Sequence, residues 1–278
     1  MFVDSDDWIE LNTCERLSSV LSDNECELLL FDHIKEYSNG VQKRPETGLA
    51  KNTLHHMEDV ATKEKLYRRA MGTPNQGNER LSTIYYSCDK VFLKAFLLEN
   101  GLVYPAGLPK SEDKVFILRC FEKMHRMYYL NEAFYHYRIN VLSASNKYSQ
   151  SVDKERRDLS VYLEEIARRM DSEMAVLTGD PSYNKIYKDY MRFVFGITSD
   201  VLFSKYYHKD YPGSRKQRNK EVREFLNSEP FRKAIEFCRY KDLGTEAKIK
   251  KFMLSHGLTT VFCEARRAKK RAMGQVGQ

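Results

Sequence analysis

The spacing of the apolar residues changes near residue 147, and this change sets the fold class. Before it, compact apolar runs such as Glu27–Asp32 predict buried strands that alternate with helices. After it, apolar residues recur at helical spacing, and turn residues separate helices predicted at 151–172, 184–206, 215–227, 229–242, 245–255 and 258–273. We therefore expect an α/β region over residues 1–146 and an all-α region over residues 147–278.

Composition and charge limit the kinds of protein that fit this chain. Hydrophobic residues make up 42% of it and charged residues 31%, as in an ordinary globular protein, and no apolar run approaches the ~20 residues of a membrane span. The six cysteines are scattered without a Cys-x-x-Cys pair, which argues against a zinc site and for reduced thiols in the cytoplasm. Residues 1–145 carry a net charge of −3 and residues 146–278 one of +10, so the two regions are expected to have different roles.

The most informative motif is the acidic turn Asp4-Ser5-Asp6-Asp7, which follows the apolar residues Phe2 and Val3. It predicts the end of a buried parallel strand that opens into a site, because sites in open α/β sheets form at the carboxyl ends of strands. Carboxylates in such a turn suit Mg²⁺ or Mn²⁺ and, through the metal, a diphosphate. From these residues alone an acidic helix N-cap fits equally well, and a phosphatase with an Asp-x-Asp nucleophile stays open.

Two later segments carry further polar groups. Glu112 and Asp113 open a helix predicted over 114–124; the helix dipole favours acids there without any function, but they also suit a general base for an acceptor hydroxyl. Arg138 ends a predicted strand before a Ser/Asn turn that includes Ser143. A guanidinium group suits a phosphate because it binds the oxygens in a bidentate fashion, although an amphipathic edge strand explains this segment as well.

Together these segments resemble the inverting family-2 glycosyltransferases, which have the GT-A fold. The resemblance rests on Phe2–Trp8, Ser87–Phe92, Glu112–Phe116 and Tyr135–Arg138 with Ser143, which follow the family's order at about its spacing. It covers residues 1 to about 146 and implies a partial GT-A-like, Rossmann-like sheet there. It also implies a metal-dependent enzyme that transfers a sugar from a nucleotide-sugar donor to a saccharide or lipid-linked hydroxyl acceptor with inversion, in cell-surface polysaccharide synthesis.

The resemblance assigns roles to the residues that match the family's motifs. The implied site consists of the metal ligands Asp6 and Asp4 for Mn²⁺ or Mg²⁺, the base Asp113 beside Glu112, and the substrate-binding residues Trp8, Lys90, Arg138 and Ser143. Asp4 would contact the metal or the ribose, and Asp7 would support the turn. Lys90 lies in a segment in which Cys88-Asp89 replaces the family's commoner residues, which leaves its role less defined.

One departure from the family is large. Its members begin with a βαβαβ nucleotide-binding half of roughly 80–100 residues before the Asp-x-Asp turn, and here only three residues precede Asp4. We therefore expect a truncated glycosyltransferase sequence, inactive alone if the nucleotide has too few contacts. One alternative is a partner chain that supplies the other half, and another is a non-catalytic binding or assembly partner at a membrane or with another subunit.

Two basic stretches lie in the helical region, at Ser214–Lys220 and Glu264–Arg271. A solvated helix face and a frayed end explain both, and we favour this interpretation. The alternative is peripheral contact of the basic C-terminal helix with anionic lipid headgroups on the cytoplasmic face of a membrane, where each basic residue contributes about 1 kcal/mol. Nucleic acid is not expected, because no recognised nucleic-acid module accompanies the charge.

Overall fold

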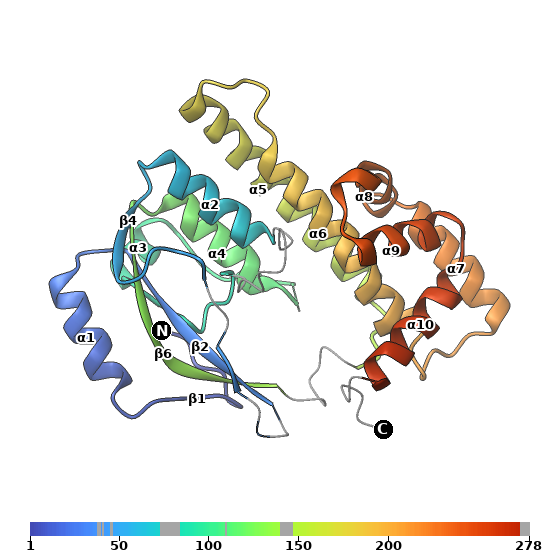
Figure 1. Ribbon diagram of the computed structural model, residues 1–278, viewed down its shortest axis with the longest axis horizontal. Coiled ribbons are helices and arrows are strands. Elements are labelled where there is room, and N and C mark those ends of the chain that lie inside the picture. Colours follow the sequence, from blue (N-terminus) through green and yellow to red (C-terminus); the bar gives the residue numbers. More distant parts are fainter. Residues whose placement is uncertain are drawn as a thin grey trace. The chain divides into compact units, whose positions relative to one another are not determined.

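The structure is a computed structural model that describes residues 1–37, 40, 42–44, 47–72, 84–108, 110–139 and 147–272. It confirms the expected fold class, an α/β region followed by helices (Figure 1). The chain divides into two compact units, one of Met1–Asn140 and Leu163–Asp189, the other of Val141–Tyr162 and Tyr190–Gln278. Part of the helical region therefore belongs to the same unit as the sheet.

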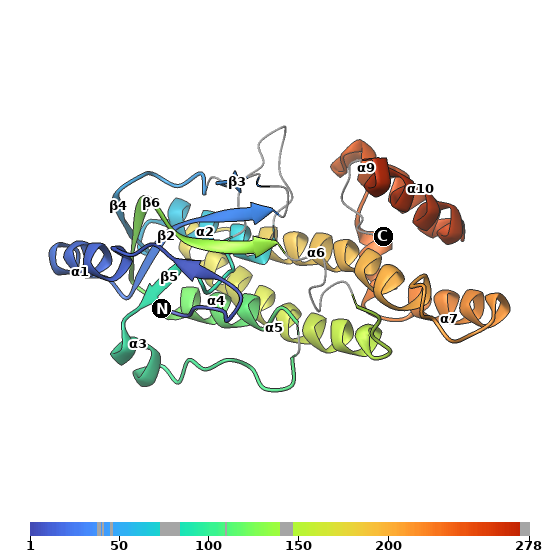
Figure 2. The same ribbon diagram turned by 90° about the horizontal axis from the view of Figure 1, so that it is seen from below.

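The sheet is built around two long parallel neighbours, β2 (Leu28–Tyr37) and β6 (Arg126–Ile139), which lie side by side in Figure 2. The shorter strands pair with them in antiparallel fashion: β5 (Lys90–Phe92) and β3 (Gln42–Lys43) with β2, and β4 (Thr53–His56) and β1 (Trp8–Ile9) with β6. The first half of β2 is a continuous buried run, as its sequence predicts for a central strand.

The polar residues Asn131 and Glu132 interrupt the apolar pattern of residues 126–138, which from the sequence predicts two strands, 126–130 and 132–138, and this prediction is wrong. The structure has one strand of 14 residues. Its pairing with β2 shifts register twice: Phe31 faces Leu130, Asp32 faces Ala133 and His33 faces Tyr135. The extra residues of the bulge in β6 are therefore Asn131, Glu132 and Phe134. The polar pair that interrupts the apolar pattern therefore marks the bulge within one strand.

The buried parallel strand expected at Phe2 and Val3 is also absent from the structure. These residues are 39% and 47% exposed and belong to no strand. The chain instead turns at Asp4, whose carbonyl oxygen accepts a hydrogen bond from the amide of Asp7 at 3.1 Å. The strand forms only after the turn, where Trp8 pairs antiparallel with His136 on the edge of β6.

The described residues before 140 form four helices: α1 (Thr13–Asp23), α2 (Val60–Met71), α3 (Lys94–Glu99) and α4 (Glu112–Lys123). Helix α1 lies on one side of the sheet and α2 and α4 on the other (Figure 1). Leu17 and Val20 of α1 join a buried apolar cluster with Leu29 and Phe31 of β2. Helix α2 ends at Gly72, whose positive φ of 94° suits a residue without a side chain.

The remaining helices follow the predicted positions closely. They are α5 (Val152–Thr178), α6 (Lys185–Val201), a π-helical turn (Leu202–Tyr206), α7 (Arg215–Asn227), α8 (Phe231–Phe237), a 3₁₀ turn (Tyr240–Asp242), α9 (Thr245–Ser255) and α10 (Thr259–Ala272). The aromatic residues Tyr190, Phe195 and Tyr206 are buried and form part of the core of this region. Across the described ranges, none of the helices is both long and apolar enough to cross a membrane.

Candidate functional site

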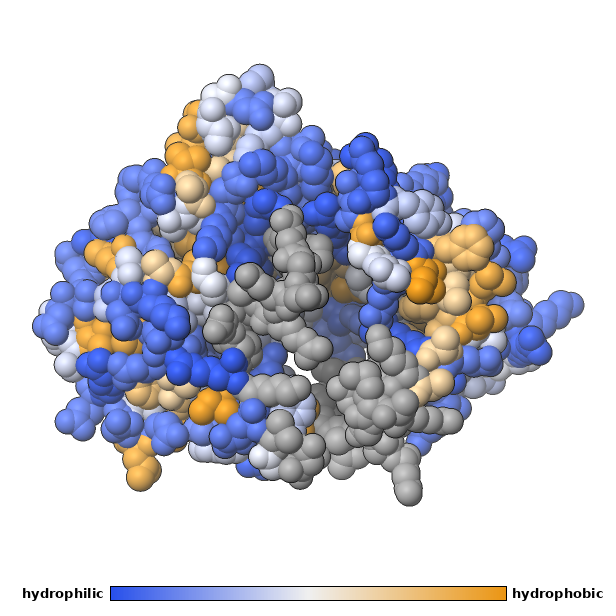
Figure 3. All heavy atoms as spheres, viewed as in Figure 1, coloured by the Kyte–Doolittle hydropathy of each residue, from blue (hydrophilic) through white to orange (hydrophobic). Residues whose placement is uncertain are grey.

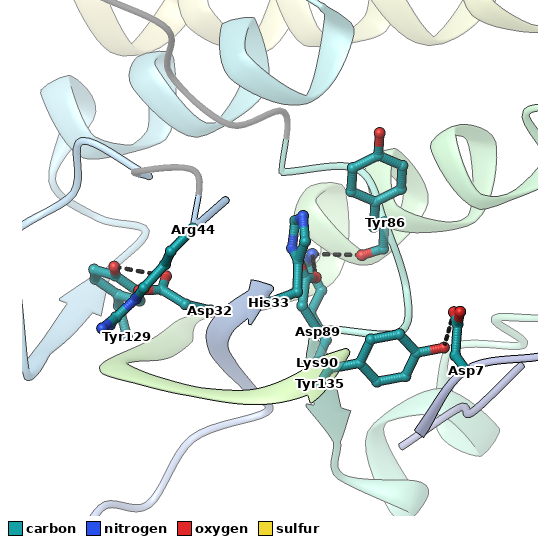
Figure 4. Close-up of polar contacts among 9 residues, drawn as sticks. All are labelled: Asp7, Asp32, His33, Arg44, Tyr86, Asp89, Lys90, Tyr129 and Tyr135. Carbon is teal, nitrogen blue, oxygen red and sulfur yellow. Dashed lines mark hydrogen bonds and ion pairs between the residues drawn. The ribbon is translucent and has the colours of Figure 1, made fainter. Parts of the chain in front are cut away.

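The acidic turn is fastened to β6 through the side chain of Asp7. Its Oδ2 accepts a hydrogen bond from the Tyr135 hydroxyl at 2.7 Å, and its Oδ1 accepts one from the Arg138 amide at 2.8 Å (Figure 4). The same tyrosine oxygen accepts a hydrogen bond from the Asp4 amide at 3.1 Å. With Asp7 committed to the sheet, Asp4 and Asp6 are left in the exposed part of the turn.

The carboxylates of this turn repel one another and a fourth acid. Partial desolvation raises the pKa of Asp4, and the negative charges of Asp7, Asp113 and Asp6 raise it further, in that order. The structure therefore places Asp113, 109 positions away in sequence, in the same electrostatic neighbourhood as the turn. This local excess of negative charge is of the kind that a divalent cation offsets.

Asp113 is held at the start of α4 by two hydroxyl groups. The hydroxyls of Tyr104 and Ser87 donate to its Oδ1 at 2.9 Å and 3.0 Å. Within the described part of the chain no donor reaches its Oδ2. Ser111 occupies the N-cap position of α4 with a left-handed backbone (φ 69°), and its side chain makes no capping hydrogen bond. The carboxylate is therefore oriented by its neighbours and keeps one oxygen for another group.

An aromatic cluster joins the helix of Asp113 to the acidic turn. Tyr104 stacks on Phe116 of α4 with ring centroids 4.4 Å apart. Phe2, two residues before Asp4, contacts the edges of both rings at 5.4 Å and 5.9 Å. The sequence motifs contain Phe2 and Phe116, but nothing in them pointed to Tyr104 as the link between the two acids.

Lys90, expected to bind substrate, has a fully buried side chain in β5. Its ammonium group donates to the Tyr86 carbonyl oxygen at 2.5 Å and to Asp89 Oδ1 at 2.6 Å (Figure 4). The other oxygen of Asp89 lies 3.0 Å from Nδ1 of His33 on β2. Burial raises the pKa of Asp89, but the charges of Lys90 and His33 outweigh burial and lower it. The geometry thus gives Lys90 an internal ion pair beneath the site.

Trp8 and Arg138 lie together at the other end of the turn. The guanidinium carbon of Arg138 lies 5.3 Å from the centroid of the Trp8 ring. The His136 ring stacks on the same indole, with the two ring centroids 4.9 Å apart. Nδ1 and Nε2 of His136 lie 2.7 Å and 2.9 Å from carboxylate oxygens of Glu36 and Glu10. Arg138 is exposed and stays close to the acidic turn, whose Asp7 accepts its amide hydrogen.

Two of the expected site residues add little to this geometry. Ser143 lies outside the described residues. Glu112 is half-buried in the first turn of α4, next to Asp113.

A buried polar cluster around Asp32 on the sheet was not predicted from the sequence. Asp32 of β2, opposite the bulge of β6, accepts hydrogen bonds from Arg44 at 2.6 Å and 2.8 Å and from the Tyr129 hydroxyl at 2.8 Å. Figure 4 shows it on the opposite side of His33 from Asp7. Its carboxylate is occupied by these partners, so we assign it to holding the bulge.

The residues that the structure describes contain no group of three or more His, Cys, Asp or Glu side chains arranged to hold a metal ion by themselves. Asp4 and Asp6 nevertheless offer carboxylate oxygens on an exposed turn. Mg²⁺ is commonly bound by one or two carboxylates together with substrate phosphates, so the residues present fit a metal that arrives with a diphosphate.

Fold and site define a mixed α/β protein with a helical C-terminal region and carboxylates gathered around a turn at the sheet. No protein-family model matches the chain. It is similar to the Bacillus subtilis (strain 168) protein named "Putative glycosyltransferase EpsH", with 23% identity over 153 residues, which are 54% of this chain and 40% of EpsH. The chain thus spans less than half the length of this relative. The similarity agrees with the glycosyltransferase resemblance of the motifs.

Among solved structures the chain is similar to S. aureus TarS. The crystal structure of TarS 1-349 gives a TM-score of 0.46 at 16% identity and covers 96% of this chain and 66% of that one. TarS 1-349 in complex with UDP-GlcNAc gives 0.47 at 17% identity, covering 100% and 68%. TM-scores at this level are too low to transfer the role of any residue.

Proposed function

We propose that this chain takes part in glycosyl transfer from a nucleotide-sugar to a hydroxyl acceptor, with inversion at the sugar. The observation that carries the proposal is the convergence of Asp113 with Asp4 and Asp6. A base candidate at a helix start and an exposed acidic turn lie in one electrostatic neighbourhood and are joined by the Phe2–Tyr104 contact. The similarity to a protein named as a glycosyltransferase supports the same reaction class.

Asp113 is suited to act as the general base. With Oδ1 fixed by the Tyr104 and Ser87 hydroxyls, Oδ2 is free to accept the proton of an acceptor hydroxyl. As that O–H bond breaks, the acceptor oxygen bonds to the anomeric carbon, and the bond from this carbon to the diphosphate oxygen breaks. Attack from the face opposite the leaving group inverts the configuration. The acceptor we propose is a saccharide or a lipid-linked saccharide.

Asp6 and Asp4 would hold Mn²⁺ or Mg²⁺ at the turn. A bound divalent ion stabilises negative charge that develops on the leaving diphosphate. The chain's own contribution is the turn geometry, fixed by Asp7 and Tyr135, and the mutual repulsion of the carboxylates, which a cation offsets. Arg138, exposed beside the turn, would contact the diphosphate.

The remaining expected residues act differently in this proposal. Trp8 supports Arg138 through the ring that its guanidinium group covers. Lys90 would act indirectly, because its ammonium group is buried with Asp89 and supports the strand behind the site. Ser143 keeps its expected role in substrate binding, which the described residues do not test.

Calorimetric titration of UDP-sugars in the presence of Mn²⁺ tests the proposal. We expect saturable binding that is lost in Asp6→Asn and retained in the matched control Asp23→Asn, which changes an exposed acid at the end of α1. Circular dichroism would confirm that both variants fold. If the folded wild-type chain binds none of the UDP-sugars with or without Mn²⁺, the chain acts instead as a non-catalytic partner.

A further inference from the structure

Helix α9 presents two large apolar side chains to solvent and buries two of its three lysines. Lys250 and Lys251 are 8% and 9% exposed, whereas Ile249 and Phe252 are 51% and 49% exposed. This is the reverse of the usual amphipathic arrangement, in which long charged side chains face water. A single exposed apolar side chain is common on protein surfaces. A helix that exposes two large apolar side chains and buries two lysines is unusual and calls for an explanation.

The two lysines fix the rotation of α9 about its axis. The Lys250 ammonium group donates to the carbonyl oxygens of Phe195 and, at 3.0 Å, Gly196 on α6. The Lys251 ammonium group donates to the carbonyl oxygens of Ile235 and Cys238, both at 2.6 Å, at the end of α8. Each lysine donates its hydrogen bonds to backbone oxygens inside the unit. These bonds therefore fix the orientation of α9 that exposes Ile249 and Phe252.

The exposed apolar surface continues onto the start of α10. Leu258 and Val261 are 41% and 51% exposed, and the two helices pack against each other through the tight turn at Gly257. Figure 3 shows apolar side chains gathered over α9 and α10. We call the four side chains Ile249, Phe252, Leu258 and Val261 the α9–α10 apolar face.

The segment that carries this face has a net positive charge. Residues 245–272 contain eight Lys and Arg residues, of which Lys250 and Lys251 are buried, against two Asp and Glu residues. Lys248, next to Ile249, is exposed, and the last turns of α10 carry Lys269, Lys270 and Arg271 in the sequence. An apolar face within a strongly basic segment matches the composition of helices that lie in the interface of anionic bilayers.

We propose that the α9–α10 apolar face docks on an anionic lipid surface, with its apolar side chains among the acyl chains and the basic residues at the headgroups. A second copy of this chain is a poorer occupant, because the two basic segments would repel each other on contact. The proposal does not depend on the glycosyl-transfer reaction, since it concerns lipid binding by a surface that contains none of the proposed site residues.

Vesicle flotation of the full chain tests the proposal. We expect the protein to float with vesicles of phosphatidylcholine and phosphatidylglycerol in equal parts, and much less with phosphatidylcholine alone. The double variant Ile249→Ser/Phe252→Ser is expected to bind at least about tenfold more weakly. The matched control Val176→Ser/Leu177→Ser removes two exposed apolar residues from α5 and should bind like the wild type.

Two results would overturn the proposal. One is flotation of the Ile249→Ser/Phe252→Ser variant equal to that of the wild type. The other is a wild-type chain that does not float with anionic vesicles, whether it stays monomeric or forms a concentration-dependent dimer that the same double variant abolishes in light scattering. Thermal unfolding of all variants, followed by circular dichroism, ensures that loss of binding is not loss of fold.

Discussion

The hydroxyl of Tyr135 donates a hydrogen bond to Oδ2 of Asp7 at 2.7 Å and so ties the longest strand of the sheet to the acidic turn. The same oxygen accepts the Asp4 amide hydrogen. One phenol group thus fixes both ends of the turn that carries the proposed metal ligands. Burial and the neighbouring acid Asp7 raise the pKa of Tyr135, so the hydroxyl keeps its proton and stays a donor at neutral pH.

Replacing Tyr135 by Phe should loosen this turn without emptying the core. We expect a loss of about 1–2 kcal/mol in the free energy of unfolding and weaker Mn²⁺-dependent binding of the donor. Tyr128→Phe, on the same strand, is the matched control. Urea unfolding and calorimetry measure the two effects. Unchanged donor binding in a Tyr135→Phe protein would show that the turn does not need this anchor.

The Tyr104 hydroxyl orients the proposed base Asp113. In Tyr104→Phe the ring still stacks on Phe116, so the fold should remain, while the hydrogen bond to the carboxylate is lost. We predict a kcat about tenfold lower with KM for the donor nearly unchanged, because only the base is affected. Tyr162→Phe, at an exposed position of α5, serves as the control. Equal kcat in both variants would remove Tyr104 from the mechanism.

Removing only one partner of the buried Lys90–Asp89 ion pair should destabilise the fold more than removing both. Lys90→Met leaves a buried carboxylate without its main partner, and we expect a loss of about 3–5 kcal/mol. The double variant Asp89→Asn/Lys90→Met should be less damaged than the single one. Urea unfolding of the wild type, the single variant and the double variant measures the free energy of unfolding of each. A Lys90→Met protein as stable as the wild type, with weaker donor binding, would instead place the lysine on the substrate.

His136 gives the stability of the folded chain a pH dependence. Burial lowers the pKa of this histidine, but the hydrogen bonds with Glu36 and Glu10 outweigh burial and raise it above its usual value. Because the pKa of His136 is higher in the folded chain than in the unfolded chain, its protonation stabilises the fold. This stabilisation is fully present at a pH below the pKa of the unfolded chain, about 6.5, and is lost as the pH rises through the pKa of the folded chain. The difference in melting temperature between wild type and His136→Gln should therefore be larger at about pH 5.5 than at about pH 8.5. A difference that grows towards alkaline pH would contradict this assignment.

Helix bounds were predictable where the sequence contains local signals. Helix α7 has the predicted bounds 215–227 because Ser214 caps it, accepting a hydrogen bond from the Gln217 amide, and the Pro212-Gly213 pair prevents an earlier start. The fold class followed from the change of apolar spacing. The bulge in β6 and the strand at Trp8 were not predictable, because both depend on how β6 pairs with segments about a hundred or more residues away in sequence.

The sequence was sufficient to select the acidic residues of the candidate site, but most of the contacts that these residues make could not be predicted from it. The acids at Asp4, Asp6 and Asp113 were identified from motifs, and the structure brings their charges together. The Tyr104 hydrogen bond and the burial of Lys90 were missed. A tyrosine nine positions before an acid has no characteristic spacing, and a lysine that pairs internally looks in sequence like one that faces solvent.

In the proposed reaction Asp113 deprotonates the acceptor, and transfer kinetics of Asp113→Asn test this role. The substitution keeps the size of the side chain and removes the base, so we predict a kcat about a thousandfold lower with donor binding by calorimetry unchanged. Asp158→Asn, at an exposed position of α5, should retain the wild-type kcat. Sugar transfer at the wild-type rate by folded Asp113→Asn would contradict the claim.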